Sequence, residues 1–490
     1  MVSQSQIHEL HFILVPLMAQ SHLIPFTEMA KVLAHHGVKV TVILTPLNAA
    51  RFNIFLENAK ASSLNIEFLS LRFPGQEVGL PEGCESFDSL PSFNLISQFF
   101  AATNMLQKPL EEWLEESESL PNCIISDLCL PWTTEIALKF KIPRLIFQTT
   151  SCFSLLCSHN ITSSNVLEGV TSDSEPFLVP NMPDRTEFTI AQLPKGMRKS
   201  SSEFKNLLDK LKMDGLLAQG MVINSFEELE PRYVEEYKKV VKNIWCIGPL
   251  SLCNKISDEL ENGNDTSIDE YNCMSWLDSM KPGSVIYVCF GSLCQMMASQ
   301  LVELALGLEA SNCPFIWVIK KGDYSKEFEN WLVDENFEER TKERGLIILG
   351  WAPQVQILSH SAIGGFLTHC GWNSTLEAVS AGVPVITWPM IAEQFYNEKL
   401  LVQVLRIGVR MGINVSMDNE EEKDKVLVKR EDVKKAIEQL MEEEREERIE
   451  RARKLRGITK KAVEEGGSSY FNVELLIQHI RGQVTDHQAM

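Results

Sequence analysis

Short apolar runs alternate with helical patterns along the first half of the chain. Between the first two runs, residues 21–37 repeat their apolar positions at helical spacing, and Gly37 stands where a helix C-cap belongs. A run that is apolar on both faces is typical of a strand covered on both sides. The order of these patterns predicts a parallel sheet with right-handed crossovers. The predicted strands lie in FILVPLM (12–18), VKVTVILTP (38–46), NIEFLSLRF (65–73), NCIISDLCL (122–130) and IPRLIFQTT (142–150).

A polar, acidic stretch at residues 254–270 separates this alternation from a second one. Its charges, Gly and Asn are typical of a surface linker. We therefore expect a Rossmann-like domain over 1–253 and another over 271–490. The second half ends in a charged pattern at helical spacing, which predicts solvent-exposed helix. Its predicted strands and amphipathic helix are SVIYVCFGS (284–292), ASQLVELALGLEAS (298–311), PFIWVIK (314–320), GLIILGW (345–351), IGGFLTH (363–369) and VPVITWP (383–389).

Composition narrows the possible functions. The chain has 490 residues, a formal net charge of -20 and 12 cysteines. An acidic surface repels polyanions, so nucleic acid is not expected as a partner. No Cys-x-x-Cys pair occurs and most cysteines lie in apolar runs, which indicates buried thiols in a reducing compartment and no metal site. The N-terminus lacks a basic leader and no apolar run reaches ~18 residues, so we expect a cytoplasmic protein without a membrane span. We also expect a monomer.

The segment 366–382, FLTHCGWNSTLEAVSAG, joins a strand to a helix. Ligands of open α/β sheets bind at the carboxyl ends of the strands, where helices begin. Asn373 and Ser374 are typical N-cap residues, which predicts a helix that starts at Leu376. The free N–H groups of such a helix suit phosphate, and His369 adds a further donor. An ordinary capped helix would show the same pattern.

The sequence lacks the motifs of other nucleotide-binding sites. There is no P-loop motif, no G-x-G-x-x-G in the first strand–helix turn and no Asp-x-Asp pair for a divalent ion. A diphosphate would therefore be neutralised by a helix terminus and by neutral or cationic side chains instead of Mg²⁺. Trp351 is suited to stack on a base, Glu377 to bind ribose, and Glu393 with Gln394 to bind sugar hydroxyls.

Residues 351–394 closely resemble the plant secondary product glycosyltransferase box of the family-1 UDP-glycosyltransferases. The resemblance extends over the whole chain, and it is greatest to the branch that acts on flavonoids, triterpenoids and small hormones. It implies the GT-B fold, with two facing Rossmann-like domains, the donor in the C-terminal one and the acceptor mainly in the N-terminal one. The last helix is expected to pack back on the N-terminal domain. Segments that carry the resemblance outside the box are MAQSHLIPFTEMAKVLA, IISDLCLPW, SFEELEP, WCIGPL, SWLDSMKPGSVIYVCFGS and EEGGSSYFNV.

The resemblance also assigns residues of the C-terminal half to parts of a UDP-sugar. In this family Gln at the last box position goes with glucose and His with galactose, so Gln394 implies UDP-glucose. UDP-galactose, UDP-xylose and UDP-glucuronate remain alternatives. The implied donor contacts are Trp351 and Gln354 for uracil, with Ala352 in the same site; Ser292, His369, Asn373 and Ser374 for the diphosphate; Glu377 for ribose; and Trp372, Glu393 and Gln394 for the sugar.

The candidate catalytic base is His22, directly after the first strand. A neutral imidazole has a pKa near the operating pH, and a carboxylate on its other nitrogen stabilises the imidazolium. Asp127 ends the strand CIISD and belongs to the same sheet edge. Both match the His–Asp dyad of the family, although a lone His at a strand end is more often a cap. Ser21 stands where the family usually has Gly.

Together these features predict an inverting transfer of glucose to a hydroxyl or carboxyl of a hydrophobic small molecule. A single displacement turns α-linked UDP-glucose into a β-glucoside, and the sequence offers no second carboxylate for a retaining mechanism. The acceptor is expected to be a triterpenoid sapogenin or a flavonoid, with a hormone as an alternative, and neither cofactor nor metal is expected. A non-catalytic binder is the alternative from another class. Phe99, Phe100, Phe147 and Phe153 are candidate walls of an apolar acceptor pocket, or plain core.

Overall fold

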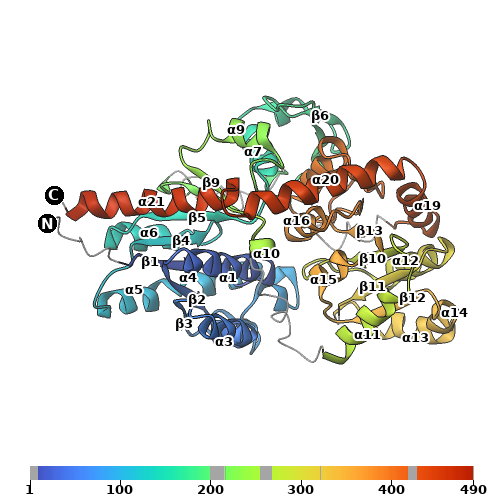
Figure 1. Cartoon of the computed structure of the whole chain (residues 1–490), viewed down its shortest axis with the longest axis horizontal. Helices are drawn as coiled ribbons and strands as arrows, with labels where there is room; N and C mark the ends of the chain where they lie inside the picture. Colours follow the sequence, from blue (N-terminus) through green and yellow to red (C-terminus); the bar gives the residue numbers. More distant parts are fainter. Residues whose placement is uncertain are drawn as a thin grey trace.

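The computed structural model places the two halves of the chain in two Rossmann-like domains that face each other (Figure 1). It describes residues 9–198, 215, 217–253, 267–320, 322–417 and 427–488. Of the predicted linker, residues 254–266 lie outside this part, and helix α11 begins at Ser267. The paired parallel sheets confirm the predicted GT-B architecture.

The N-terminal sheet has the strand order β3-β2-β1-β4-β5-β8-β9, and its paired neighbours are parallel. The direction of strand addition reverses between β1 and β4, which is where ligands bind in such sheets. The five predicted strands are confirmed. Short β8 and β9 escaped prediction because three residues carry no readable period. The strands are β1 (His11–Val15), β2 (Lys39–Leu44), β3 (Ile66–Ser70), β4 (Cys123–Asp127), β5 (Arg144–Gln148), β8 (Met221–Ile223) and β9 (Ile244–Cys246).

Helices cover both faces of this sheet (Figure 1). The predicted first helix is confirmed as α1. It ends at His35, and Gly37 follows the C-cap residue His36 with a φ of 76°, a conformation that favours glycine. A hairpin of β6 (Pro176–Leu178) and β7 (Glu187–Thr189) lies beside the domain. The helices are α1 (Gln20–His35), α2 (Pro46–Arg51), α3 (Asn53–Ala61), α4 (Ile96–Asn104), α5 (Gln107–Glu116), α6 (Trp132–Phe140), α7 (Cys152–Thr162), α9 (Pro231–Tyr237) and α10 (Leu250–Cys253).

The C-terminal sheet has the order β12-β11-β10-β13-β14-β15, again with parallel neighbours. Its reversal lies between β10 and β13, and each predicted strand is present. The strands are β10 (Val285–Cys289), β11 (Phe315–Ile319), β12 (Gly345–Leu349), β13 (Ile363–Thr368), β14 (Val385–Thr387) and β15 (Gly408–Arg410). The helices are α11 (Ser267–Asp278), α12 (Ala298–Ala310), α13 (Lys326–Asp334), α14 (Phe337–Thr341), α15 (Gln354–Ser359), α16 (Trp372–Ala381), α17 (Gln394–Lys399), a π-helical turn (Leu400–Val404), α19 (Arg430–Met441), α20 (Arg445–Val463) and α21 (Ser468–Gln488).

The domains share packed surfaces. Helix α7 of the N-terminal domain contacts α17 of the C-terminal one, and there the Ser154 hydroxyl donates a 3.0 Å hydrogen bond to Asn397 Oδ1. The rings of Phe188 and Tyr396 meet edge to face 4.9 Å apart. These buried contacts join the two domains.

The C-terminal helices run along both domains (Figure 1). The predicted helical tail is interrupted after α19, where Glu444 has a φ of 48°, and α20 then packs against α16. Helix α21 lies on the N-terminal domain: Leu476 and Ile480 join its core, and the Ser469 hydroxyl donates to Gly248 O at 2.5 Å. The last helix therefore ties the C-terminal domain to the N-terminal one.

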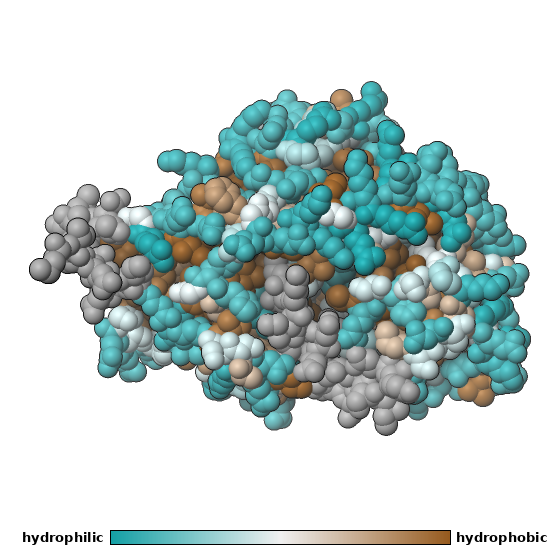
Figure 2. Space-filling model, viewed as in Figure 1, coloured by the Kyte–Doolittle hydropathy of each residue, from teal (hydrophilic) through white to brown (hydrophobic). Residues whose placement is uncertain are grey.

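Hydrophilic side chains cover most of the face shown in Figure 2, and hydrophobic ones are visible only in gaps between them. Within the described residues, no helix is both long and apolar enough to cross a bilayer.

Candidate active site

A cavity of about 660 Å³ lies between the domains at the carboxyl ends of both sheets. Its N-terminal wall contains His22, which follows β1, and Gln148, which ends β5. Its C-terminal wall contains Ser292, Lys320 and His369, which follow β10, β11 and β13. Both walls thus come from strand ends next to a topological reversal, where a ligand is expected.

The predicted base and its carboxylate are in contact. His22 Nδ1 and Asp127 Oδ2 lie 2.5 Å apart, and the side chains are 24% and 4% exposed. His22 lies in the first turn of α1, and Asp127 ends β4, the strand beside β1 in the sheet. The second carboxylate oxygen of Asp127 accepts from Cys129 N at 2.9 Å. Because Nδ1 is used, Nε2 is the nitrogen that remains for a substrate.

The two groups shift each other's pKa. Burial lowers the pKa of His22, but the charge and hydrogen bond of Asp127, with the charge of Glu393, outweigh it and the net pKa is raised. Burial raises the pKa of Asp127, and the contact with His22 and the bond from Cys129 reverse this, so the carboxyl stays ionised. The dyad is therefore a neutral or protonated imidazole beside a carboxylate.

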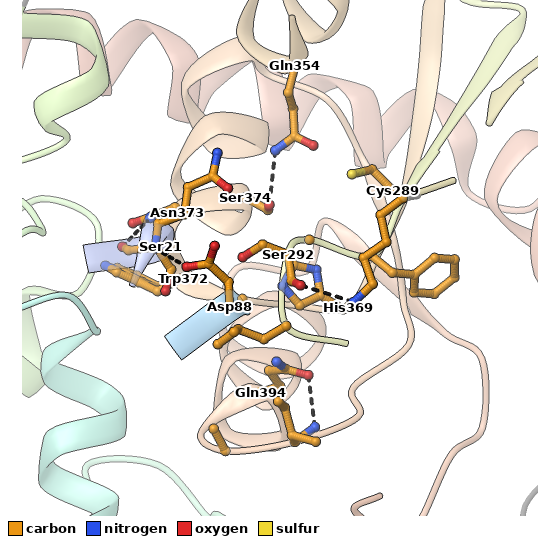
Figure 3. Close-up of a pocket in the computed structure, with 18 of the residues that line it drawn as sticks. Ser21, Asp88, Cys289, Ser292, Gln354, His369, Trp372, Asn373, Ser374 and Gln394 are labelled. Atoms are coloured by element: carbon orange, nitrogen blue, oxygen red, sulfur yellow. Dashed lines mark hydrogen bonds between the residues drawn. The ribbon is translucent and has the colours of Figure 1, made fainter. Parts of the chain in front are cut away.

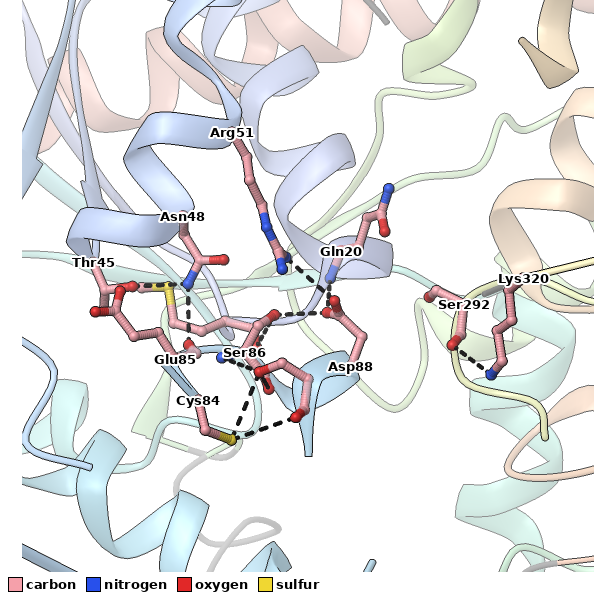
Figure 4. A network of polar contacts seen from close by, with 12 residues as sticks. Gln20, Thr45, Asn48, Arg51, Cys84, Glu85, Ser86, Asp88, Ser292 and Lys320 are labelled. Carbon is pink, nitrogen blue, oxygen red and sulfur yellow. Dashed lines mark hydrogen bonds and ion pairs between the residues drawn. The ribbon is translucent and has the colours of Figure 1, made fainter. Parts of the chain in front are cut away.

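A carboxylate that sequence reasoning missed holds the start of α1. Asp88 Oδ1 accepts from Gln20 N at 2.9 Å and from the Ser86 hydroxyl at 2.6 Å, while Arg51 lies 3.2 Å from Oδ2 (Figure 4). Ala19, the N-cap residue, has no side chain to do this. Asp88 thus acts as a distant cap that positions the turn carrying the base, and a separation of 68 residues in the chain gave no local signal.

The helix after β13 begins earlier than predicted. α16 starts at Trp372, with Gly371 as N-cap and no side-chain cap, so the predicted start at Leu376 is wrong. The polar side chains that suggested a cap are engaged elsewhere: Asn373 Nδ2 donates to Ser21 O at 2.8 Å, and the Ser374 hydroxyl bonds to Gln354 (Figure 3). The first N–H groups of the helix, which have no acceptor within it, lie at the cavity wall.

The residues predicted to bind uracil, the diphosphate and the ribose also contact one another. Gln354 Nε2 donates to Glu377 Oε2 at 2.6 Å and to the Ser374 hydroxyl at 3.0 Å, and the Tyr287 hydroxyl donates to Gln354 Oε1 at 3.2 Å. Burial raises the pKa of Glu377 to about 7 despite the bond from Gln354. Trp351 and Ala352 line the same part of the cavity.

His369 is a neutral hydrogen-bonding group, not a cation. Burial and the nearby charge of Lys320 lower its pKa to about 4. A Cβ at Gly371 would lie 2.3 Å from its Nε2, and one at Gly291 would lie 2.6 Å from Cε1. Its buried Nδ1 has no hydrogen-bond partner among the described residues. Two glycines thus make room for an imidazole with an unsatisfied nitrogen in the cavity wall.

Gly371→Ala should force this imidazole to move. Overpacking of a tight site costs about 1–3 kcal/mol, so we expect a loss of that size in the free energy of unfolding and weaker binding of UDP. Denaturant unfolding and calorimetric titration measure the two effects. Gly457→Ala is the control, because a Cβ there meets nothing within 4 Å. Wild-type stability and affinity in the Gly371 variant would contradict the packing argument.

The residues predicted for the sugar are held at the start of α17. Gln394 Oε1 accepts from Met390 N at 2.9 Å and from Ile391 N at 3.0 Å, which fixes the side-chain amide (Figure 3). Burial raises the pKa of Glu393, which also feels the charge of His22. Glu393, one of the residues predicted to bind the sugar, therefore lies near His22. Trp372 lines the cavity, but its Nε1 donates to Asn224 O at 2.6 Å and is not free for a sugar.

The four phenylalanines considered as walls of an acceptor pocket are not among the described residues that line the cavity. Phe99, Phe147 and Phe153 are buried in the core, and Phe100 packs against it, so core is the correct interpretation of these four rings. Thr149, which lies between Phe147 and Phe153 in the chain, does line the cavity. Most of the described residues that the N-terminal domain contributes to the lining are polar. That lining consists of Gln20, Ser21, His22, Ile24, Asp88, Gln148, Thr149, Thr150, Ser154, Leu155 and Ser158.

Known proteins are similar to the whole chain. Residues 8–252 match the family described as "Glycosyltransferase, N-terminal domain", and residues 268–460 match "UDP-glucoronosyl and UDP-glucosyl transferase". The chain is 50% identical over 477 residues to UDP-glycosyltransferase 73C3 of Arabidopsis thaliana, with 96% of each chain covered. It is 48% identical over 479 residues to UDP-glycosyltransferase 1 of Barbarea vulgaris, covering 96% of this chain and 97% of that one.

Two solved structures are similar in fold. The crystal structure of Glycyrrhiza uralensis UGT73P12 complexed with glycyrrhetinic acid 3-O-monoglucuronide matches with a TM-score of 0.90 and 36% identity, over 98% of both chains. The structure of Phytolacca americana UGT2 complexed with UDP-2fluoro-glucose and pterostilbene matches with a TM-score of 0.74 and 26% identity, over 96% of this chain and 100% of that one.

Proposed function

The chain belongs to the plant family-1 UDP-glycosyltransferases, and on that premise we propose that it is an inverting, UDP-glucose-dependent O-glucosyltransferase. One observation carries the proposal. The His22–Asp127 pair, 2.5 Å apart, lies on one wall of a cavity whose other wall is the nucleotide-sugar box. This arrangement supports a mechanism in which the base faces the donor across a space for the acceptor.

The dyad supplies the proton transfer. Asp127 fixes the tautomer with hydrogen on Nδ1, so Nε2 of His22 takes the proton of the acceptor hydroxyl or carboxyl. The acceptor oxygen attacks the anomeric carbon, and the bond from that carbon to the diphosphate breaks. The imidazolium that forms is stabilised by the Asp127 carboxylate. One displacement inverts the anomeric centre and gives a β-glucoside.

The donor lies along the box in chain order. In this proposal Trp351, Ala352 and Gln354 hold uracil, Glu377 binds ribose, and the start of α16 receives the diphosphate. Glu393 and Gln394 bind the sugar, supported by the fixed orientation of the Gln394 amide. Protein groups, not a divalent cation, offset the diphosphate charge.

The acceptor is proposed to be a triterpenoid or a flavonoid with several hydroxyl groups. A similar protein was solved with glycyrrhetinic acid 3-O-monoglucuronide, a triterpenoid that carries polar groups on an apolar skeleton, and another with pterostilbene, an aromatic stilbene with one hydroxyl. The polar residues Gln148, Thr149 and Ser158 in the cavity wall suit such hydroxyls, and Leu155 suits the skeleton.

A donor and acceptor panel tests the proposal. The purified protein is incubated with UDP-glucose, UDP-galactose, UDP-xylose or UDP-glucuronate and a set of triterpenoids, flavonoids and hormones. Mass spectrometry should show a gain of one hexose with UDP-glucose, and NMR should show a β linkage. Absence of any glucoside would refute the function. Faster transfer from another UDP-sugar would refute only the donor assignment.

A further inference from the structure

Lys320 is the only Lys or Arg among the described residues that line the cavity. It directly follows β11, so its side chain starts at the same sheet edge as the rest of the donor wall. The other lining residues that can carry a full charge near neutral pH are His22 and four acids. Those acids are Asp88, Asp323, Glu377 and Glu393. Among the described lining residues, Lys320 is thus the one Lys or Arg side chain with which an anionic ligand in this cavity can form an ion pair.

Contacts place this ammonium beside the predicted diphosphate residues. Lys320 Nζ donates to Ser292 O at 3.0 Å, and the side chain is 23% exposed (Figure 4). Ser292 follows Gly291, which lies against His369. The Lys320 charge is also felt at His369, where it adds to the lowering of the imidazole pKa by burial. Lys320, Ser292 and His369 therefore form one cluster.

The ammonium has donor capacity left for a ligand. A lysine has three N–H donors, and one of them is used by Ser292 O. The carboxylate of Asp323 is 3.9 Å from Nζ, which is too long for a strong hydrogen bond but close enough for attraction. Asp323 thus attracts the Lys320 ammonium without using all of its N–H donors.

Transfer of the sugar makes the diphosphate more negative. The acceptor proton moves to His22, the acceptor oxygen bonds to the anomeric carbon, and the old bond to the phosphate oxygen breaks. Its electron pair stays on that oxygen, so UDP leaves with an added negative charge. A cation fixed beside this oxygen binds the transition state more strongly than the ground state, which is what accelerates a reaction.

We propose that Lys320 is a catalytic residue whose ammonium binds the diphosphate of the donor and offsets the charge that develops on UDP. This inference rests on the proposed glycosyl transfer. Neutral His369 and the α16 N-terminus donate hydrogen bonds to the same group, and Lys320 supplies the full positive charge.

The alternative is a purely structural role, in which Lys320 only stabilises the loop through its hydrogen bond to Ser292 O. Three variants separate the two roles. Lys320→Gln keeps a donor for Ser292 O and removes the charge, whereas Lys320→Arg keeps the charge. Lys326→Gln removes one positive charge from an exposed site on α13 and is the control. Lys320→Met replaces the Gln variant if the latter does not fold.

Calorimetric titration with UDP and with uridine needs no sugar and no acceptor. Lys320→Gln should weaken UDP binding by about 10- to 100-fold, the range for hydrogen bonds to charged groups, and leave uridine binding unchanged. The Arg and Lys326 variants should bind UDP nearly as the wild type does. At saturating UDP-glucose, turnover of the Gln variant should fall by about 10²-fold.

The outcomes distinguish the two proposals. Wild-type UDP affinity in Lys320→Gln, or an equal loss for uridine and UDP, would overturn the role of Lys320 and leave the enzyme assignment intact. If the wild-type protein does not bind UDP at all, the proposed function and the role of Lys320 both fail.

Discussion

His22→Ala is expected to lower kcat/KM for glucosyl transfer by about 10²- to 10⁴-fold, the range for loss of a general base. The imidazole is the one group in the described cavity wall that is paired with a buried carboxylate through one nitrogen and has the other available. Alanine removes the proton acceptor and leaves the nucleotide wall untouched. UDP affinity should therefore stay close to wild type while the initial rate with a preferred acceptor falls.

A histidine on the same helix gives the matched control for this prediction. His35 is exposed at the end of α1, and its replacement by alanine should not change the rate. Circular dichroism and a thermal melt verify that both variants fold. If His22→Ala retains near-normal kcat/KM, the base lies elsewhere and the dyad is structural.

The predicted elements succeeded where the hydrophobic pattern was long and local. Strands β1 and β10 are continuous apolar runs, and the strand–helix junction after β13 places His369, Asn373 and Ser374 in the cavity wall. The pairing of His22 with Asp127 followed from two strand ends at one sheet edge, because β1 and β4 are neighbours. The strands follow from sequence periodicity and the pairing from parallel-sheet geometry, whereas the roles assigned to the paired residues and to the box came from the resemblance to the family.

Contacts between distant segments escaped prediction. Asp88, in a loop distant in the chain, accepts the hydrogen bond at the start of α1 that the N-cap residue cannot accept. Lys320 follows β11 directly, and its ammonium bonds to Ser292 in the C-terminal wall of the cavity. The start of α16 was misplaced because Asn373 bonds to Ser21 in the opposite domain instead of capping its own helix. In each case a long-range partner overrode the local preference of the residue.

These inter-domain bonds also connect the two halves of the reaction. Asn373 of the donor box holds the carbonyl of Ser21, one residue before the base, and Trp372 Nε1 holds Asn224 O. The first turn of α16 is thereby in direct contact with the turn that carries His22. Asn373, predicted to bind the diphosphate, therefore also helps to position His22.

Asp127→Asn is the second variant with a large expected effect, about 10²- to 10⁴-fold on kcat/KM. Asp127 Oδ1 accepts from Cys129 N at 2.9 Å, and an Asn keeps that bond with its oxygen. Its amide nitrogen then faces His22 Nδ1 in place of Oδ2. Nδ1 becomes an acceptor, and the hydrogen moves to Nε2, where it blocks proton uptake from the acceptor substrate.

The pH profile distinguishes this mechanism from a loss of structure. In the wild type the pKa of His22 is raised above its ordinary 6.5, so kcat/KM should fall as the pH drops through that raised value and the base becomes protonated. Without the carboxylate, burial dominates and lowers the pKa of His22, so the acid limb should move to lower pH. Rates measured from about pH 5 to 9 test this. An acid limb that stays in place, or moves to higher pH, would show that Asp127 does not set the protonation of the base.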